Sequence, residues 1–457
     1  MYGFKVLLPD IQSPEILRRA VISLGTDTCH VDGCAAFVGL APTCSQRLRR
    51  CLPIENSRMD LPHIPTPLRV CHVINDLQVG GAQVMLYKLL SRLDRSRFDS
   101  RVISLTESGP LAEPLQEIGV PVEVCHMPRG RPTLSSLFRL WRQLSQPRLD
   151  VIQTWLFHSD LLGGVVSRWT RLKVPVVWNI RHGSLCSTID KRSTLWTVKL
   201  CSLLSNHLPS RIIVNSQAGR SMYREIGYAP DKLEVIPNGF DTDHFCPSVE
   251  ARHMMRRELG IADDATLIGL VGRYHPHKDH GTFMEAAGQV LKSRPDTHFL
   301  LCGDGIDGAN GELLERIQHA GSMANFHLLG RRDDLPTIQA SLDVAVSSSL
   351  TEGFPNVIGE AMSCGVPCVV TDSGGSSEVV GDTGRVVPCG DAKALADACL
   401  EILKMPHEHR HRLGDLARQR IVTQFSLERA TECYADLWQN VAGAARVATP
   451  LGARRAA

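Results

Sequence analysis

The sequence contains no run of about 20 consecutive apolar residues, so nothing in it predicts a helix that spans a membrane. Near the N-terminus no clean apolar stretch precedes a small-residue cleavage site, which argues against a secretory signal. Low-complexity tracts and internal repeats are also absent. The remaining composition, 43% hydrophobic and 21% charged, is that of an ordinary globular protein, and 457 residues favour two domains.

The 15 cysteines form no pattern typical of a metal site. Many stand inside apolar runs, where they behave as small hydrophobic residues, as at Cys71, Cys302 and Cys399. The best metal-like spacing, Cys364 to Cys368, has no second pair at a zinc-ribbon interval, so we expect no structural metal. Reduced thiols without a signal sequence predict a cytoplasmic location.

Charge is nearly balanced overall but unevenly distributed. The net charge is +2, with 22 Lys/Arg against 15 Asp/Glu in residues 67–246 and 21 against 27 in residues 247–457. A basic first half beside an acidic second half indicates that one domain faces an anionic partner, and we expect no nucleic-acid partner.

Residues 1–66 differ from the rest because they show no sustained helical or alternating periodicity. We expect a poorly ordered extension and hypothesise that translation starts at Met59, since the first convincing strand begins at Leu68. Peptides upstream of Met59 in the native protein would refute that hypothesis.

From residue 68 short apolar runs alternate with helical stretches, and the alternation restarts after the turn Pro237-Asn238-Gly239. Such runs suit parallel strands buried on both faces. The predicted strands are 69–75, 101–105, 151–154, 175–180, 211–215, 267–272, 298–302, 326–329, 343–347 and 366–371. We therefore predict an α/β protein with two doubly wound, Rossmann-like domains (67–243 and 244–424) facing across an interdomain cleft, and a closing segment 425–457.

Two carboxylates, Glu352 and Glu360, stand eight positions apart and flank a Gly-Phe-Pro-Asn turn. Pro355 suits the first turn of a helix, which would leave Glu352 in the preceding loop and Glu360 a little over one turn inside. The free N–H groups of that helix start suit a phosphate or a sugar oxygen. The alternative is a solvated helix with two surface glutamates.

Two further loops follow predicted strands. In the first, Arg273 and Lys278 could converge on a diphosphate, although ordinary loop cations show the same spacing. In the second, Gly80 and Gly81 open a helix and would let the backbone approach a phosphate closely. This stretch is neither a Walker A loop nor a GxGxxG motif.

These motifs, in this order, resemble the family 4 glycosyltransferases, which are retaining enzymes of the GT-B fold. The resemblance extends from about residue 68 to about residue 440. It is most specific in the Glu352–Glu360 pair, the segment 361–375 that follows it, the turn 235–241, and the late segment 425–441, which resembles a helix crossing back to the first domain.

The resemblance implies a role for each motif. Glu360 would bind the donor ribose and Glu352 the transferred sugar, while Arg273 and Lys278 would hold the diphosphate. The other implied donor contacts are the backbones of Gly353, Phe354, Pro355 and Asn356, the pair Gly80 and Gly81, and, near the base, Gly330 and Arg331.

One position departs from the commoner family pattern. Trp155 stands where many relatives carry a histidine that is usually placed near the sugar. His158 either takes over that contact or packs under the loop. Arg181 and His182 fit an acceptor-facing or phosphate-facing loop with less support.

The resemblance also implies front-face substitution without an enzymic nucleophile, and by family habit the donor is a UDP-sugar. No Asp-x-Asp motif appears near a strand end, so fixed cations would replace a divalent ion. We predict metal independence and no cofactor.

The acceptor side is basic and amphipathic. Residues 129–148 carry five arginines and no acidic residue, interleaved with apolar residues, and residues 191–204 have similar character. Such helices suit an anionic membrane surface, which would place a lipid-linked acceptor and the protein at the inner face of the membrane. Two packed helices with solvated basic faces are the alternative.

We expect a transferase that acts on a sugar or a lipid-linked acceptor in surface polysaccharide or glycolipid assembly. Two other functions compete with this one. A nucleotide-sugar epimerase of GT-B shape would convert the free donor and leave no product on an acceptor. A non-catalytic nucleotide-sugar binding module would have no reason to keep the two glutamates and the two cations together.

Overall fold

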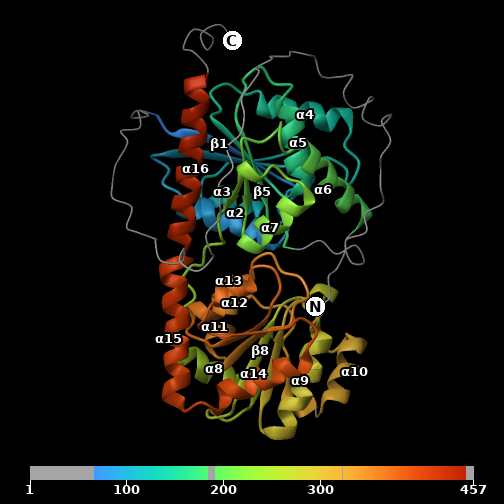
Figure 1. Ribbon diagram of the computed structural model, residues 1–457, viewed down its shortest axis with the longest axis vertical. Coiled ribbons are helices and arrows are strands. Elements are labelled where there is room, and N and C mark those ends of the chain that lie inside the picture. The colour runs from blue at the N-terminus through green and yellow to red at the C-terminus, as the bar shows by residue number, and fades with distance from the viewer. Residues whose placement is uncertain (1–65, 184–190, 322, 449–457) are drawn as a thin grey trace, which may run out of the picture. The chain divides into compact units, whose positions relative to one another are not determined.

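The computed structural model describes residues 66–183, 191–321 and 323–448. The expectations for the extension up to residue 65, including a start at Met59, and for the tail after residue 448 lie outside these residues. The described chain forms two parallel sheets, each with helices on both faces (Figure 1).

The first sheet has seven strands in the order β3-β2-β1-β4-β5-β6-β7. Its strands are β1 Leu68–Ile74, β2 Phe98–Ser104, β3 Val122–Val124, β4 Val151–Trp155, β5 Val176–Ile180, β6 Arg211–Val214 and β7 Leu233–Val235. Its helices are α2 Gly81–Arg92, α3 Ala112–Glu117, α4 Leu134–Leu144, α5 Phe157–Ser167, α6 Arg192–Leu204 and α7 Gln217–Ile226.

The second sheet has six strands in the order β10-β9-β8-β11-β12-β13. Its strands are β8 Leu267–Val271, β9 His298–Cys302, β10 Phe326–Leu328, β11 Val344–Ser347, β12 Cys368–Thr371 and β13 Arg385–Val387. The helices of this half are α8 Val249–Leu259, α9 His280–Ser293, α10 Gly311–Ala320, α11 Leu335–Ala340, α12 Asn356–Ser363, α13 Ser376–Val380, α14 Ala392–Lys404 and α15 His407–Gln424, and α16 Leu427–Ala448 follows.

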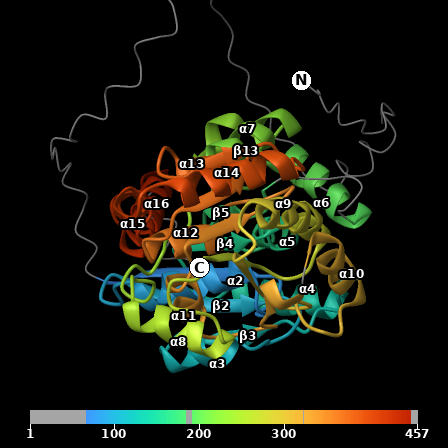
Figure 2. The ribbon, with the colours of Figure 1, turned by 90° about the horizontal axis from the view of Figure 1, so that it is seen from below.

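The strands are buried on both faces because successive side chains point to opposite sides. In β8, Ile268 and Leu270 join the core under α9 and α14, whereas Leu267 and Val271 join the core under α11 and α12. Figure 2 shows α9 and α14 on the other side of this sheet from α8 and α11. This two-sided burial confirms the predicted α/β fold with two doubly wound sheets.

All ten predicted strands are present, with ends that differ by up to three residues. The sequence reading missed β3, β7 and β13, which have three residues each and lie at sheet edges. Three residues carry little alternation, so such short strands are difficult to distinguish from loops, although β10, of the same length and also at an edge, was predicted.

The last helix, α16, packs on the first sheet although it follows the second in sequence (Figure 1). Tyr434 and Trp438 are fully buried there, and the Trp438 indole donates to Gln153 Oε1 at 2.8 Å. The chain passes between the halves at Phe240 and Ser426, which form a parallel β-bridge. None of the helices in the described ranges is long and apolar enough to cross a bilayer.

Candidate active site

The loop from β11 to α12 carries both predicted carboxylates. Glu352 lies in the loop, and Glu360 is the fifth residue of α12. Pro355 immediately precedes the helix instead of occupying its first turn, which corrects the sequence expectation. Its φ of −75° fits a helix, but its ψ of 93° is extended, so helical geometry begins only at Asn356.

Glu352 is held by groups from two loops of the second sheet. Lys278 follows β8 in the short 3₁₀ turn η2 (Pro276–Lys278), and its Nζ lies 2.5 Å from Glu352 Oε1. The Ser349 hydroxyl donates to the same oxygen at 2.7 Å. The two charged side chains are only 24% and 11% exposed, so water screens their attraction weakly. A sequence-predicted cation and a sequence-predicted carboxylate therefore meet.

Glu360 is held from the other half of the molecule. Its residue is 7% exposed, and its Oε1 lies 3.1 Å from Lys88 Nζ, which projects from α2. No local sequence pattern predicts this pair, because Lys88 and Glu360 are 272 positions apart.

Two helix N-termini come together at this place. α2 begins after Gly80, which is extended and provides no side-chain cap, and a Cβ on Gly81 would lie 3.6 Å from Asn356 Nδ2 at the start of α12. Asn238, from the turn between the halves, donates to Asn356 Oδ1 at 2.5 Å. Helix N-termini carry partial positive charge, so their convergence favours an anion such as a phosphate.

Glycines from both halves enclose the Glu352 backbone. A Cβ on Gly183, after β5, would lie 1.6 Å from the Glu352 carbonyl oxygen, and one on Gly374, after β12, would lie 1.7 Å from the same atom. Only glycine allows backbone to approach backbone so closely. Neither glycine was singled out from the sequence as part of the site.

The loops predicted to lie near the base of the donor nucleotide are joined by backbone contacts. Gly303, after β9, donates to the Gly330 carbonyl at 2.8 Å, and a Cβ on Gly303 would lie 2.3 Å from the carbonyl oxygen of Gly272, at the start of the loop with Arg273. Arg273 and Arg331 are both exposed. Gly330 thus connects to the Arg273 loop, while Arg331 points into solvent.

The histidines after β4 and β5 are placed differently. His158 lies in the first turn of α5, is half-buried, and its pKa is lowered by that burial. Among the described residues, no hydrogen bond, ion pair or ring contact joins His158 to Lys278 or Glu352. The His182 ring, in contrast, meets the His277 ring edge-on at 6.4 Å, directly beside Lys278.

Trp155, where many relatives carry a histidine, is a fully buried core residue. Its indole donates to His72 Nδ1 at 3.3 Å, and its ring stacks on Tyr434 of α16. Arg181 lies over the same ring and donates to the Tyr434 hydroxyl at 3.0 Å and to Asn238. Burial lowers the pKa of Arg181, and its partners attach the loop after β5 to α16 and to the turn between the halves.

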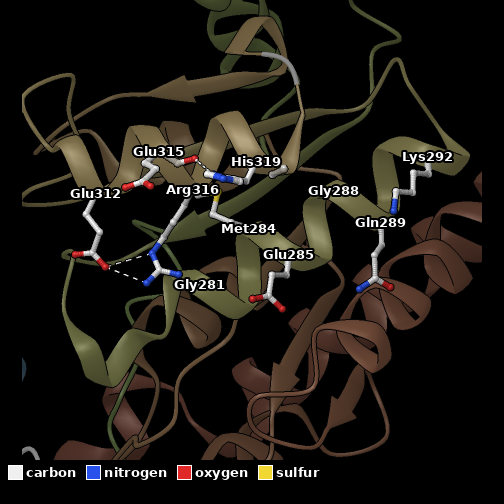
Figure 3. Close-up of a pocket in the computed structure, with 11 residues that line it drawn as sticks. Gly281, Met284, Glu285, Gly288, Gln289, Lys292, Glu312, Glu315, Arg316 and His319 are labelled. Atoms are coloured by element: carbon white, nitrogen blue, oxygen red, sulfur yellow. Dashed lines mark hydrogen bonds and ion pairs between the residues drawn. The ribbon is translucent and has the colours of Figure 1, made fainter.

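An open groove with a volume of about 640 Å³ lies between α9 and α10 (Figure 3). None of the predicted site residues lines it. Figure 3 shows Arg316 turned toward Glu312, with which it forms an ion pair at 3.0 Å. The convergence of loops at Glu352 is a stronger indication of a site than this open groove.

The sequence does hold one Asp-x-Asp spacing, Asp241-Thr242-Asp243, in the turn between the halves. The Asp241 carboxylate forms an ion pair with Arg92 at 2.9 Å and accepts a hydrogen bond from the backbone N–H of His244. Within the part of the chain that the structure describes, no group of three or more His, Cys, Asp or Glu side chains is arranged to hold a metal ion.

Comparison with known proteins agrees with this geometry. Residues 79–244 match the family described as "Glycosyltransferase Family 4", and residues 265–405 match "Glycosyl transferases group 1". Among solved structures, Anabaena HepE in complex with UDP and glucose has a TM-score of 0.71 at 23% identity, covering 82% of this chain and all of that one. Sucrose-phosphate synthase from Thermosynechococcus elongatus has a TM-score of 0.67 at 19% identity, with 82% and 100% coverage.

Curated relatives extend over most of the chain. The UDP-Gal:alpha-D-GlcNAc-diphosphoundecaprenol alpha-1,3-galactosyltransferase of Escherichia coli is 26% identical over 385 residues, covering 81% of this chain and 96% of that protein. The lipopolysaccharide core biosynthesis mannosyltransferase LpsB of Rhizobium meliloti is 28% identical over 330 residues, covering 69% and 87%. Two Rossmann-like sheets with these matches define a GT-B glycosyltransferase. The chain belongs to the family 4 glycosyltransferases.

Proposed function

We propose that the protein transfers a sugar from a UDP-sugar to a lipid-linked acceptor with retention of anomeric configuration, in surface polysaccharide or glycolipid assembly. The observation that carries the proposal is the pairing of Lys278 with Glu352 beside two converging helix N-termini. This arrangement combines a cation and helix ends for a diphosphate with a carboxylate for sugar hydroxyls.

Each group has a defined part in the proposed reaction. Glu352 accepts hydrogen bonds from the transferred sugar, and Glu360 accepts them from the ribose. As the bond from the anomeric carbon to the diphosphate breaks, Lys278 and Arg273 stabilise the developing negative charge. The acceptor oxygen bonds to the anomeric carbon on the same face, and its proton passes to the departing diphosphate oxygen.

The donor and acceptor classes are supported by relatives. The Escherichia coli relative is named for a UDP-galactose donor and a diphosphoundecaprenol-linked acceptor, and HepE was solved with UDP and glucose. The neighbourhood of Lys278 also supports metal independence, because fixed cations supply the charge that a divalent ion would otherwise bring.

A basic surface with exposed apolar side chains supports membrane contact. Leu134 and Phe138 on α4 are 87% and 59% exposed, and Trp196 on α6 is 61% exposed. The exposed Arg142 and Lys199 lie on the same two helices. Both helices pack on α5, so they belong to one face of the first half. Exposed aromatics among cations are typical of proteins that bind anionic lipid.

This surface predicts binding to vesicles that contain phosphatidylglycerol. We expect the protein to sediment with them more than with neutral phosphatidylcholine vesicles, and the Phe138→Ser/Trp196→Ser variant to lose most of that binding. Leu416→Ser, which alters a residue that is 47% exposed on α15, is the matched control and should bind like the wild type. Equal sedimentation with neutral and anionic vesicles would count against membrane contact.

A transfer assay tests the enzymatic proposal. The protein is incubated with UDP- and GDP-sugars and a polyprenyl-diphosphate sugar acceptor, with and without excess chelator. We expect one UDP-sugar to be consumed only when acceptor is present, at a rate unaffected by chelator. Conversion of the free donor without acceptor would favour an epimerase, and loss of transfer in chelator would overturn metal independence.

A further inference from the structure

The ion pair between Lys88 and Glu360 joins the two halves of the molecule at the proposed ribose site. Lys88 belongs to α2 on the first sheet and Glu360 to α12 on the second, and their charged atoms are 3.1 Å apart. The side chains are 19% and 9% exposed, so the pair is largely withdrawn from solvent. Pairs in such surroundings interact more strongly than exposed ones.

Lys88 is also held from a second side. Its ammonium lies 5.6 Å from the centre of the Phe245 ring, and Phe245 is itself buried. A cation over an aromatic face is attracted to it, which further restricts the lysine head group. The side chain is therefore directed toward Glu360.

One turn further along α2, Arg92 provides a contrast. It pairs with Asp241 at 2.9 Å, also across to the segment that links the halves, but its side chain is 40% exposed and does not reach α12. The same helix face thus carries one pair at the proposed donor site and one away from it.

We propose that Lys88 is a positioning residue of the donor site, which holds the Glu360 carboxylate for the ribose and makes ribose binding depend on the approach of the two halves. This inference rests on the proposed function, in which Glu360 accepts the ribose hydroxyls. A carboxylate offers about four lone-pair positions, so the lysine and the ribose can bind it together. Lys88 binds Oε1, and no hydrogen bond from another described residue reaches Oε2, so the lone pairs of Oε2 stay available to the nucleoside.

The test compares Lys88→Met, Glu360→Ala and the double variant by UDP titration calorimetry and by donor kinetics. Lys88→Met should raise the UDP Kd and the donor KM about tenfold, with kcat within about twofold of wild type. Lys88→Arg should recover most of the affinity, and Arg92→Met should leave it unchanged. Melting curves of all variants check that they fold.

The double variant decides the mechanism. If Lys88 acts through Glu360, the double variant binds UDP no more weakly than Glu360→Ala alone. Additive losses would mean that Lys88 contacts the donor directly and would overturn the inference, as would wild-type affinity in Lys88→Met. A wild-type protein that neither binds UDP nor transfers sugar would instead overturn the proposed function, and this inference with it.

Discussion

Replacement of Lys278 by alanine is expected to lower kcat about 10²–10³-fold, the usual cost of removing one fixed group that stabilises developing charge. Its ammonium lies 2.5 Å from Glu352, and in the proposed reaction it contacts the departing diphosphate. Of the two cations proposed to stabilise the departing diphosphate, Lys278 is the more enclosed, because Arg273 is exposed. Steady-state kinetics with the donor identified in the transfer assay measures the effect.

Lys292→Ala is the matched control for this experiment. Lys292 is an exposed lysine of α9 that lines the groove between α9 and α10 (Figure 3), and Glu352 is not among the residues that line this groove. Its loss should leave kcat and KM unchanged. A Lys278→Ala enzyme with wild-type kcat would show that the diphosphate is stabilised elsewhere.

Gly183→Ala is expected to lower activity about 100-fold, because displacing a reacting group by about 1 Å has effects of that size. The new methyl group would lie 1.6 Å from the Glu352 carbonyl oxygen and 2.2 Å from the Gly353 nitrogen. Both are backbone atoms, so no side chain can rotate away. The loop after β5 and the loop with Glu352 must then separate.

The control is Gly308→Ala, where an added methyl group meets no atom within 4 Å. We expect this variant to keep wild-type activity. Circular dichroism and thermal melting should show that Gly183→Ala still folds. Wild-type kinetics in a folded Gly183→Ala protein would contradict the close packing of the two halves around Glu352.

Most of the fold could be predicted because buried parallel strands leave strong local signals. Runs such as Leu267–Val271 contain no polar side chain and are followed by a glycine. The observed strand there is one residue shorter than the predicted one. β13 could not be found in this way, since Arg385 and the exposed Val386 leave Val387 as its only buried residue. Pairing with β12 makes it a strand, and this contact is not visible in local sequence.

The candidate site was predictable where its members belong to one motif, and less so where they meet across the molecule. Glu352 and Glu360 lie eight positions apart, but Lys88 reaches Glu360 across 272 positions. The histidine question shows the same limit. His158 follows the family position in sequence, yet His182 is the histidine beside His277 because β5 ends next to the loop of the other half. The roles assigned to all of these residues stay predictions.

Retaining transfer is tested most directly by proton NMR of the product as it forms with the wild type and with Glu360→Ala. We expect an acceptor-linked sugar with the anomeric configuration of the donor, formed at a rate that falls at least tenfold in the variant because the ribose contact is lost. An inverted anomeric centre, or equal rates in the two proteins, would contradict the proposed function.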